Sequence, residues 1–212
     1  MELIDISPTV HPGIGVWPGD VPYQAAKALR MADGANLDLG SLHSTYHVGA
    51  HADAPQHYVE GGADAASVPL APYVGPCQVV DVAANRGQRF GRDDLKEAPA
   101  SPRILFKTGT FGDPDDWNTD FAAPEPELID ELAALGVVLV GFDTPSTDLF
   151  DDEALLSHHR LAAHQMANLE GLVLEHVPAG HYTLLALPLK LADADASPVR
   201  AVLAPADAFG AV

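Results

Sequence analysis

The 212-residue chain contains a single cysteine, Cys77. One thiol cannot form an intramolecular disulfide, so the fold has to depend on its hydrophobic core. Cys77 lies in an apolar segment, residues 74–80, where a cysteine is more often a small buried residue than a nucleophile. The sequence therefore excludes a disulfide-stabilised scaffold and predicts a structural cysteine.

Basic residues are also scarce. The chain has 11 Lys and Arg against 30 Asp and Glu, which gives a formal net charge of −19 at pH 7. The basic residues are scattered between Lys27 and Arg200 and form no patch that could follow a phosphate backbone. This composition argues against a nucleic-acid partner and indicates a well-solvated acidic surface.

Long apolar runs are absent. No segment approaches the length of a membrane span, and residues 1–8 lack the basic start and continuous apolar stretch of a secretion signal. No internal repeat or low-complexity linker divides the chain. We therefore expect a single domain over residues 1–212, no membrane partner and a cytoplasmic location.

The apolar pattern predicts several elements. Residues 125–135 carry leucine and isoleucine at helical spacing and are followed by Gly136, which is typical of an amphipathic helix. Residues 137–142 form a continuous apolar run that indicates a buried strand. We expect further strands over residues 104–108, 172–177, 182–189 and 201–204. A helix followed directly by a buried strand favours an α/β fold in which strands outnumber helices.

One short segment, residues 47–57, concentrates chemistry-bearing side chains. Imidazole nitrogen and carboxylate oxygen are the ligands that zinc and manganese take. Gly49 permits a close backbone approach and Pro55 restricts the residue before it, so the segment is shaped rather than merely polar. The sequence therefore predicts a metal site formed by three imidazoles and a carboxylate: His47, His51, Asp53 and His57.

The spacing of His47 and His51 also matches the helix of zincin metalloproteases. Val48 stands where that motif places its glutamate base, and Gly49 weakens a helix. A metalloprotease of this kind is therefore disfavoured.

A second set of candidate ligands, His158, His159 and Glu170, lies in the carboxyl half. On a straight helix the α-carbons of His158 and Glu170 would be about 18 Å apart, too far for one metal centre. If both belong to the site, the helix must end early, and Asn168 is our predicted left-handed terminator. Spacing alone leaves open the alternative that these residues are exposed on a helix.

Taken together, the motifs resemble those of the cyclase-like metal-dependent hydrolases, and within them the bacterial kynurenine formamidases. The resemblance spans nearly the whole chain, with the motifs in the expected order. They are residues 17–20 (WPGD), 47–57, 143–146 (DTPS), 158–159 (HH), 168–172 (NLEGL) and 185–190 (LALPLK).

This resemblance implies an α/β single domain of the swivelling β/β/α type that forms a homodimer and holds two Zn²⁺ per chain, with Mn²⁺ as the alternative. It implies that His47, His51 and Asp53 bind the first ion, that Asp53 bridges, that His158 binds the second and that Glu170 reaches both. His57 would be the catalytic acid/base and Trp17 a substrate contact. One departure is Ala50, where relatives usually have threonine, which removes a supporting hydroxyl but no ligand.

The implied reaction is hydrolysis of N-formyl-L-kynurenine to L-kynurenine and formate. A serine hydrolase with the same activity would need a Gly-x-Ser-x-Gly elbow, which the sequence lacks. Two alternatives remain open at this stage: a hydrolase acting on a cyclic amide such as isatin, and a non-catalytic metal-binding protein. Asp143 to Ser146 receives no role beyond a turn that supports the site.

Overall fold

The computed structural model describes residues 2–208, and its centre is a mixed sheet of seven strands in the order β1-β13-β11-β5-β7-β9-β10. β5, β7, β9 and β10 are parallel to one another, whereas β11, β13 and β1 join them in antiparallel pairs. The strands are β1 (Ile4–Asp5), β5 (Val74–Asp81), β7 (Arg103–Lys107), β9 (Leu139–Phe142), β10 (Ala167–Leu169), β11 (Gly180–Leu185) and β13 (Val202–Pro205).

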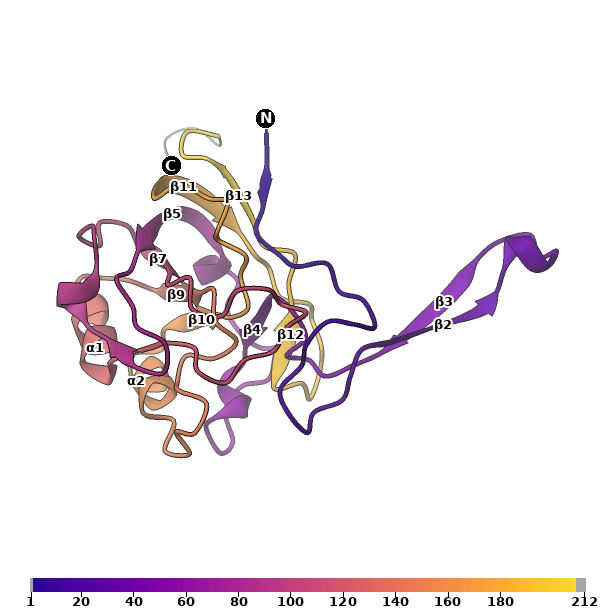
Figure 1. Ribbon diagram of the computed structural model, residues 1–212, viewed down its shortest axis with the longest axis horizontal. Coiled ribbons are helices and arrows are strands. Elements are labelled where there is room, and N and C mark those ends of the chain that lie inside the picture. The colour runs from indigo at the N-terminus through magenta and orange to yellow at the C-terminus, as the bar shows by residue number, and fades with distance from the viewer. Residues whose placement is uncertain (1, 209–212) are drawn as a thin grey trace.

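Two helices cover one face of the parallel strands: α1 (Pro126–Ala134) precedes β9, and α2 (Leu156–His164) precedes β10 (Figure 1). Side chains alternate across β7, because Ile104 and Phe106 pack in the cluster with the helices whereas Leu105 packs in the cluster on the other face. Both faces are therefore buried, which explains why these strands are continuous apolar runs in the sequence.

In the part of the chain that the structure describes, three small two-stranded sheets complete the fold. β4 (His51–Asp53) pairs with β12 (Ala196–Pro198), and β6 (Arg89–Phe90) pairs with β8 (Ala123–Pro124). β2 (Gln24–Leu29) and β3 (Leu39–His43) form a hairpin that projects from the body of the molecule (Figure 1). Short 3₁₀ helices span Met31–Asp33, Pro55–His57, Ala71–Tyr73 and Arg92–Asp94.

The strand-rich α/β fold predicted from the sequence is confirmed. The predicted strands at residues 104–108, 137–142 and 201–204 correspond to β7, β9 and β13, and the predicted helix corresponds to α1. Cys77 is fully buried, as expected, and burial raises the pKa of its thiol to about 12. Within residues 2–208 no helix is long and apolar enough to cross a membrane.

Two strand predictions need correction. Residues 172–177 bury Leu172 and Leu174, but they form no strand, because their amides bond singly to separate partners: Leu172 to Phe142 and Val173 to Ile6. The segment thus has an apolar pattern without a continuous neighbouring strand. The predicted strand at 182–189 begins earlier, at Gly180, and ends at Leu185, before Pro188, which has no backbone N–H to donate.

The terminator of α2 was also assigned to the wrong residue. The helix does end early, as shared use of His158 and Glu170 requires, but the left-handed residue is Gln165, with φ of 53°. Asn168 lies instead in β10 and pairs with Val140. The chain therefore turns back three residues sooner than predicted. Glu170 directly follows β10, which places it at the site.

Candidate metal centre

β4 presents His51 and Asp53 on the same side, since alternate residues of a strand face the same way. β4 is held from both directions. On one side Asp53 pairs with Ala196 of β12, and on the other the amides and carbonyls of His51 and Glu170 exchange hydrogen bonds of 3.1 and 3.0 Å. Backbone pairing thus brings the predicted ligands of the two halves of the chain together.

The side chains of the first cluster converge on one buried carboxylate. Asp53 Oδ1 lies 3.2 Å from His47 Nδ1 and 3.6 Å from His51 Nε2. His51 Nε2 is also 3.3 Å from Glu170 Oε2. His51, Asp53 and Glu170 are each at most 3% exposed, so these charges and ring nitrogens face one another without bulk water.

His158 closes the site from α2. Its Nε2 lies 3.5 Å from Asp53 Oδ2 and 3.3 Å from Glu170 Oε1. The neighbouring His159 is exposed on the helix surface. The structure therefore places His158, and not His159, beside the two carboxylates.

The donor set fits divalent cations. His47, His51 and Asp53 offer ligand atoms within 4.8 Å of one another, and so do Asp53, His158 and Glu170, so the two groups share Asp53. Among the described residues, the buried His51 Nε2 and Asp53 Oδ1 have no hydrogen-bond partner. A buried ring nitrogen and carboxylate oxygen left unpaired are costly, and a shared cation would satisfy both.

The site strongly favours positive charge. Burial would lower the pKa of His47, but its hydrogen bonds to Asp195 and Asp53 raise it to about 10. Burial and the charge of Asp53 would raise the pKa of Glu170, but His158 and His51 lower it to about 2. Burial would raise the pKa of Asp53 too, but His158 and His47 lower it, so both carboxylates are held ionised in a buried space where cations would compensate them.

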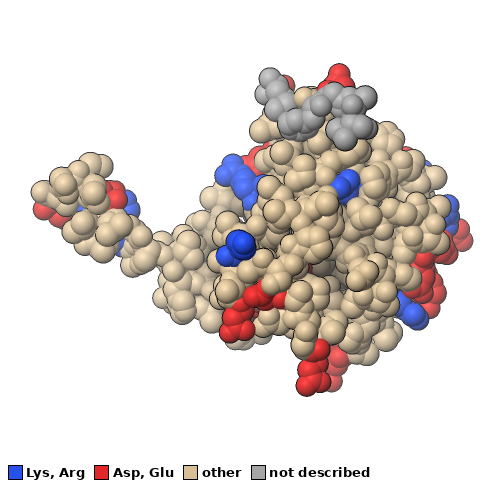
Figure 2. All heavy atoms as spheres, turned by 180° about the vertical axis from the view of Figure 1, so that it is seen from behind, with Lys and Arg blue, Asp and Glu red and all other residues tan. Residues whose placement is uncertain are grey.

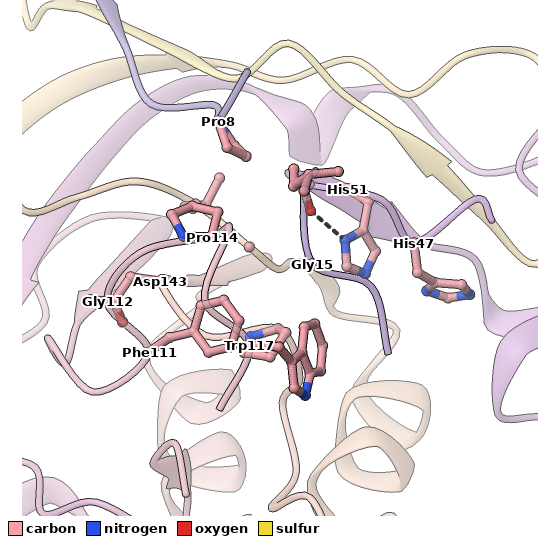
Figure 3. Close-up of a pocket in the computed structure, with 14 residues that line it drawn as sticks. Pro8, Gly15, His47, His51, Phe111, Gly112, Pro114, Trp117 and Asp143 are labelled. Carbon is pink, nitrogen blue, oxygen red and sulfur yellow. Dashed lines mark hydrogen bonds between the residues drawn. The ribbon is translucent and has the colours of Figure 1, made fainter. Parts of the chain in front are cut away.

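Two ring tautomers are fixed by hydrogen bonds from Nδ1. His51 Nδ1–H donates to the carbonyl of Gly49 at 3.0 Å, and His158 Nδ1–H donates to Asp148 Oδ2 at 2.7 Å (the first bond is drawn in Figure 3). Each Nδ1–H bond consequently leaves Nε2 as the ring nitrogen that faces the carboxylates, and in the neutral ring Nε2 is the atom that binds a metal.

Asp148 holds the ring of His158 and was not revealed by the sequence motifs. It is fully buried, and besides the ring of His158 it accepts the backbone amides of Ser157 and His158 at 3.0 Å each. Arg89 Nη2 donates to Asp148 Oδ1 at 2.7 Å. The residue lies just after the predicted turn at 143–146, which was the only signal pointing to this segment.

Asn168 and Thr147 orient the two carboxylates. Asn168 Nδ2 donates to Asp53 Oδ2 at 2.8 Å and to Glu170 Oε1 at 3.1 Å. Thr147 donates to Glu170 Oε1 from both its amide and its hydroxyl, each at 2.7 Å. In contrast, Asp143 faces away and accepts hydrogen bonds from Thr108 and Gly109. The turn at 143–146 therefore supports the site through Thr147, the residue that directly follows it.

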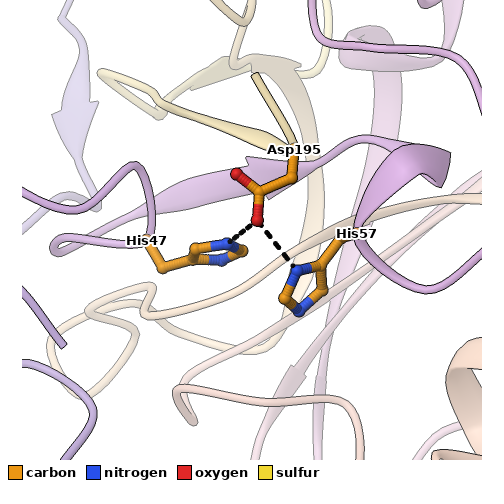
Figure 4. A group of neighbouring side chains, drawn as sticks. All are labelled: His47, His57 and Asp195. Carbon is orange, nitrogen blue, oxygen red and sulfur yellow. Dashed lines mark hydrogen bonds and ion pairs between the residues drawn. The ribbon is translucent and has the colours of Figure 1, made fainter. Parts of the chain in front are cut away.

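His57 lies at the mouth of the site. Its ring is 4.4 Å from the ring of His47 and 6.2 Å from that of His158, measured between centroids, and it is more exposed than any of the five buried or half-buried candidate ligands. Its Nδ1 lies 3.1 Å from Asp195 Oδ2, and the same oxygen lies 3.1 Å from His47 Nε2 (Figure 4).

Asp195 is the second residue that the sequence did not reveal. It stands directly before β12, and its carbonyl accepts the amide of Ala54 at 2.8 Å, so the pairing of β12 with β4 sets its position. In a chain with so many acidic residues, nothing in the local sequence distinguishes this aspartate from its neighbours.

A cavity of about 490 Å³ opens over the site. Trp17 lines it and stacks on Phe150, with 4.9 Å between ring centroids and an angle of 30°. Trp117 meets the edge of Trp17 at 5.7 Å. The cavity therefore joins an aromatic wall to the imidazoles and Glu170, and it is lined by Trp17, Pro18, Gly19, Asp20, His47, His57, Trp117, Pro145, Ser146, Leu155, His158 and Glu170.

A much smaller cavity, of about 30 Å³, is lined by His47 and His51 (Figure 3). Phe111, Pro114 and Trp117 enclose it. It is too small for an organic substrate, so the larger cavity is the candidate substrate site.

Comparison with known proteins gives consistent matches. A family model described as "Putative cyclase" matches residues 4–149. Two similar solved structures are a potential metal-dependent hydrolase with cyclase activity (28% identity, TM-score 0.79, covering 95% of this chain and 96% of that one) and a predicted metal-dependent hydrolase from Bacillus stearothermophilus (27%, 0.77, 95% and 97%). An isatin hydrolase bound to the product analogue thioisatinate shares the fold at 22% identity (TM-score 0.80, 96% and 92%).

Proposed function

Since this chain belongs to the Cyclase family, we propose that it is a metal-dependent amidohydrolase whose substrate is an aryl formamide, N-formyl-L-kynurenine, cleaved to L-kynurenine and formate. The observation that carries the proposal is the convergence of three imidazoles and two carboxylates on one buried point beneath an aromatic-walled cavity. The similar metal-dependent hydrolases support the reaction class.

We propose that His47, His51 and Asp53 would hold one divalent ion and Asp53, His158 and Glu170 a second, with zinc the expected metal and manganese the alternative. When bound, such ions lower the pKa of water to roughly 7 and polarise a carbonyl oxygen. Elemental analysis of protein purified without chelator should find about two ions per chain. A value near zero would contradict the metal assignment.

His57 is the proposed acid/base. Hydrolysis adds a water oxygen to the formyl carbon and breaks the carbon–nitrogen bond, so the departing aniline nitrogen needs a proton. An imidazole is suited to deliver it near neutral pH. With Nδ1–H directed at Asp195, the Nε2 atom of His57 is free to take the proton from water and pass it to nitrogen.

Trp17 is the proposed substrate contact. It lines the cavity and is already braced by Phe150 and Trp117, so its face is held for stacking against an aryl ring. A volume of about 490 Å³ lies within the roughly 300–1,000 Å³ typical of small-molecule sites. The cavity is thus large enough for an aryl formamide with an amino-acid tail.

The deciding experiment compares N-formyl-L-kynurenine with isatin at equal metal loading. We expect faster turnover of the formamide, measured by the absorbance of the kynurenine released. We also expect loss of activity after chelation. Faster opening of isatin would transfer the function to a cyclic-amide hydrolase and leave the metal centre in place. Metal-loaded protein that turns over neither compound would favour a non-catalytic metal-binding role.

A further inference from the structure

The turn at residues 17–20 (WPGD) lies on the wall of the larger cavity, and the proposed reaction uses it only through Trp17. The Asp20 amide donates to the Trp17 carbonyl at 2.9 Å, and Gly19 has a φ of 95°. Proline at the second position and a glycine of positive φ at the third are the pattern of a type II β-turn, in which the first and fourth α-carbons lie within about 7 Å. The turn therefore holds an indole and a carboxylate close together on the cavity wall.

The carboxylate of Asp20 is available to a ligand. Among the described residues that line the cavity, the acidic ones are Asp20 and Glu170. Glu170 is 3% exposed, and its two oxygens already face His51 and His158. Asp20 is half-buried, and one of its oxygens accepts the Val21 amide at 2.7 Å. No Lys, Arg or His of the described chain forms an ion pair with Asp20, so its other oxygen can accept a hydrogen bond from a bound molecule.

The same cavity offers little to an anionic group. Among the described residues that line it, none is Lys or Arg, and its three histidines are the proposed metal ligands and acid/base. The chain carries a formal charge of −19, and Figure 2 shows no continuous patch of Lys and Arg on the described part of the face that it presents. A strongly acidic protein attracts cationic ligands and repels anionic ones. Away from the metal centre, the cavity wall therefore has a partner for an ammonium group and none for a carboxylate.

We propose that Asp20 is a specificity-determining residue that binds an ammonium group on the tail of the substrate. The inference rests on the proposed formamide hydrolysis and narrows its substrate class to aryl formamides with a cationic tail. N-formyl-L-kynurenine carries an ammonium and a carboxylate on the same carbon atom of its tail. The ammonium is the group that the protein recognises, and the carboxylate is left in solvent. The same formamide without its carboxylate is consequently a substrate as well.

The spacing of the turn suits such a tail. In the proposed substrate the amine nitrogen is four bonds from the aryl ring, and four bonds of about 1.5 Å span roughly 5 Å. This reach is comparable to the separation between the two ends of the turn, which is at most about 7 Å. Trp17 is braced by Phe150 and Trp117, so the position of its ring relative to Asp20 is fixed. A substrate ring stacked on Trp17 therefore brings its ammonium group to Asp20, where the hydrogen bond is strengthened by charge.

Four formamides test the inference on unmodified, metal-loaded protein. They are N-formyl-L-kynurenine, an amine analogue that lacks the carboxylate, an acid analogue that lacks the amine, and formanilide, which has no tail. We expect kcat/KM for the two amine-bearing compounds to exceed that for the acid analogue by about 10- to 100-fold, which is the effect of one hydrogen bond between charged groups. Equal values for the amine analogue and the acid analogue would overturn the assignment.

Two variants assign the preference to Asp20. Asp20→Asn should lower kcat/KM for the amine-bearing compounds about 10- to 100-fold, chiefly by raising KM, and leave formanilide unchanged. Asp20→Lys should reverse the preference in favour of the acid analogue. Asp116→Asn is the matched control, since Asp116 is exposed beside Trp117 but is not among the described residues that line the cavity. An equal loss on formanilide in Asp20→Asn would show that Asp20 only supports the turn, and would overturn the proposal.

Binding of the deformylated amine analogue separates this inference from the proposed reaction. The chain has two tryptophans and both line the cavity, so quenching of their fluorescence reports binding there. We expect the amine to bind at least about tenfold more tightly to the wild-type protein than to Asp20→Asn. Such binding without hydrolysis of any formamide would refute the proposed reaction and support the role of Asp20. Hydrolysis of formanilide with equal binding of the amine to both proteins would support the reaction and overturn the role of Asp20.

Discussion

Asp195 Oδ2 lies 3.1 Å from Nδ1 of His57 and 3.1 Å from Nε2 of His47, so one carboxylate oxygen joins the proposed acid/base to a proposed metal ligand. His57 and Asp195 belong to different elements, the 3₁₀ helix at Pro55–His57 and the residue before β12. The pairing of β12 with β4 therefore fixes how the proposed acid/base faces the candidate metal centre.

The first prediction concerns Asp195→Asn. The amide can still occupy the space, but it removes the negative charge that orients His57, so we expect kcat to fall about 10- to 100-fold. Asp193→Asn is the matched control, since Asp193 is two residues away, contacts neither histidine in the described structure and has a positive φ that asparagine tolerates. Equal losses in both variants would mean that Asp195 acts only through local folding.

The second prediction concerns Asp148→Asn. Asp148 fixes the tautomer of His158, so its loss should weaken metal affinity about 10- to 100-fold, measured by competition with a chelator. Asp152→Asn is the control: Asp152 also pairs with Arg89, but it makes no contact with His158 among the described residues. An affinity that is unchanged in Asp148→Asn would remove Asp148 from the metal centre.

A third prediction separates ligands from the acid/base. Asp53→Asn should lose metal and activity together, because Asp53 belongs to both ligand groups. His57→Ala should keep its metal and lose about 10²- to 10⁴-fold in kcat, which is the usual contribution of a positioned acid or base. Elemental analysis beside steady-state rates distinguishes the two. If His57→Ala emptied the site, His57 would have to be reassigned as a ligand.

The residue types of the site could be predicted from the sequence better than the strands and helix ends that bring these residues together. His51 and Asp53 were recognised by residue type, and the structure shows that they share a face because they are alternate residues of β4. The convergence with Glu170 could not be read from spacing, since it depends on a backbone bridge to His51 over a long separation. Shared use of His158 and Glu170 predicted an early end of α2, yet Gln165, and not Asn168, ends the helix.

The sequence did not reveal the residues that orient other side chains of the site. Asp148 and Asp195 contact candidate ligands or His57 only after strands and loops have packed, and local sequence gives an acidic chain no way to distinguish them from solvated aspartates. The same reason explains the wrong strand at 172–177. An apolar pattern predicts burial correctly, but whether the backbone pairs depends on which segment lies beside it.

The last prediction is that metal binding releases protons. In the metal-free protein, burial opposes the charged form of His47, but Asp195 and Asp53 hold its pKa at about 10, so the ring carries a proton at pH 7–9. A ligating imidazole must be neutral, and the entering ion therefore displaces that proton. The sign follows directly: the observed affinity should increase with pH by about tenfold per unit for each proton released, and should level off above the pKa of His47.

Isothermal titration at pH 7.5 in buffers of different ionisation enthalpy measures this release, with a chelator buffering the free ion. We expect at least one proton per site that uses His47, and the same number in His57→Ala, because His57 is proposed to act as the acid/base and not as a ligand. Asp195→Asn should release less, since His47 loses one of the two carboxylates that raise its pKa. Binding heats independent of the buffer would show that His47 is neutral before the ion enters, and would exclude the charge compensation inferred for this site.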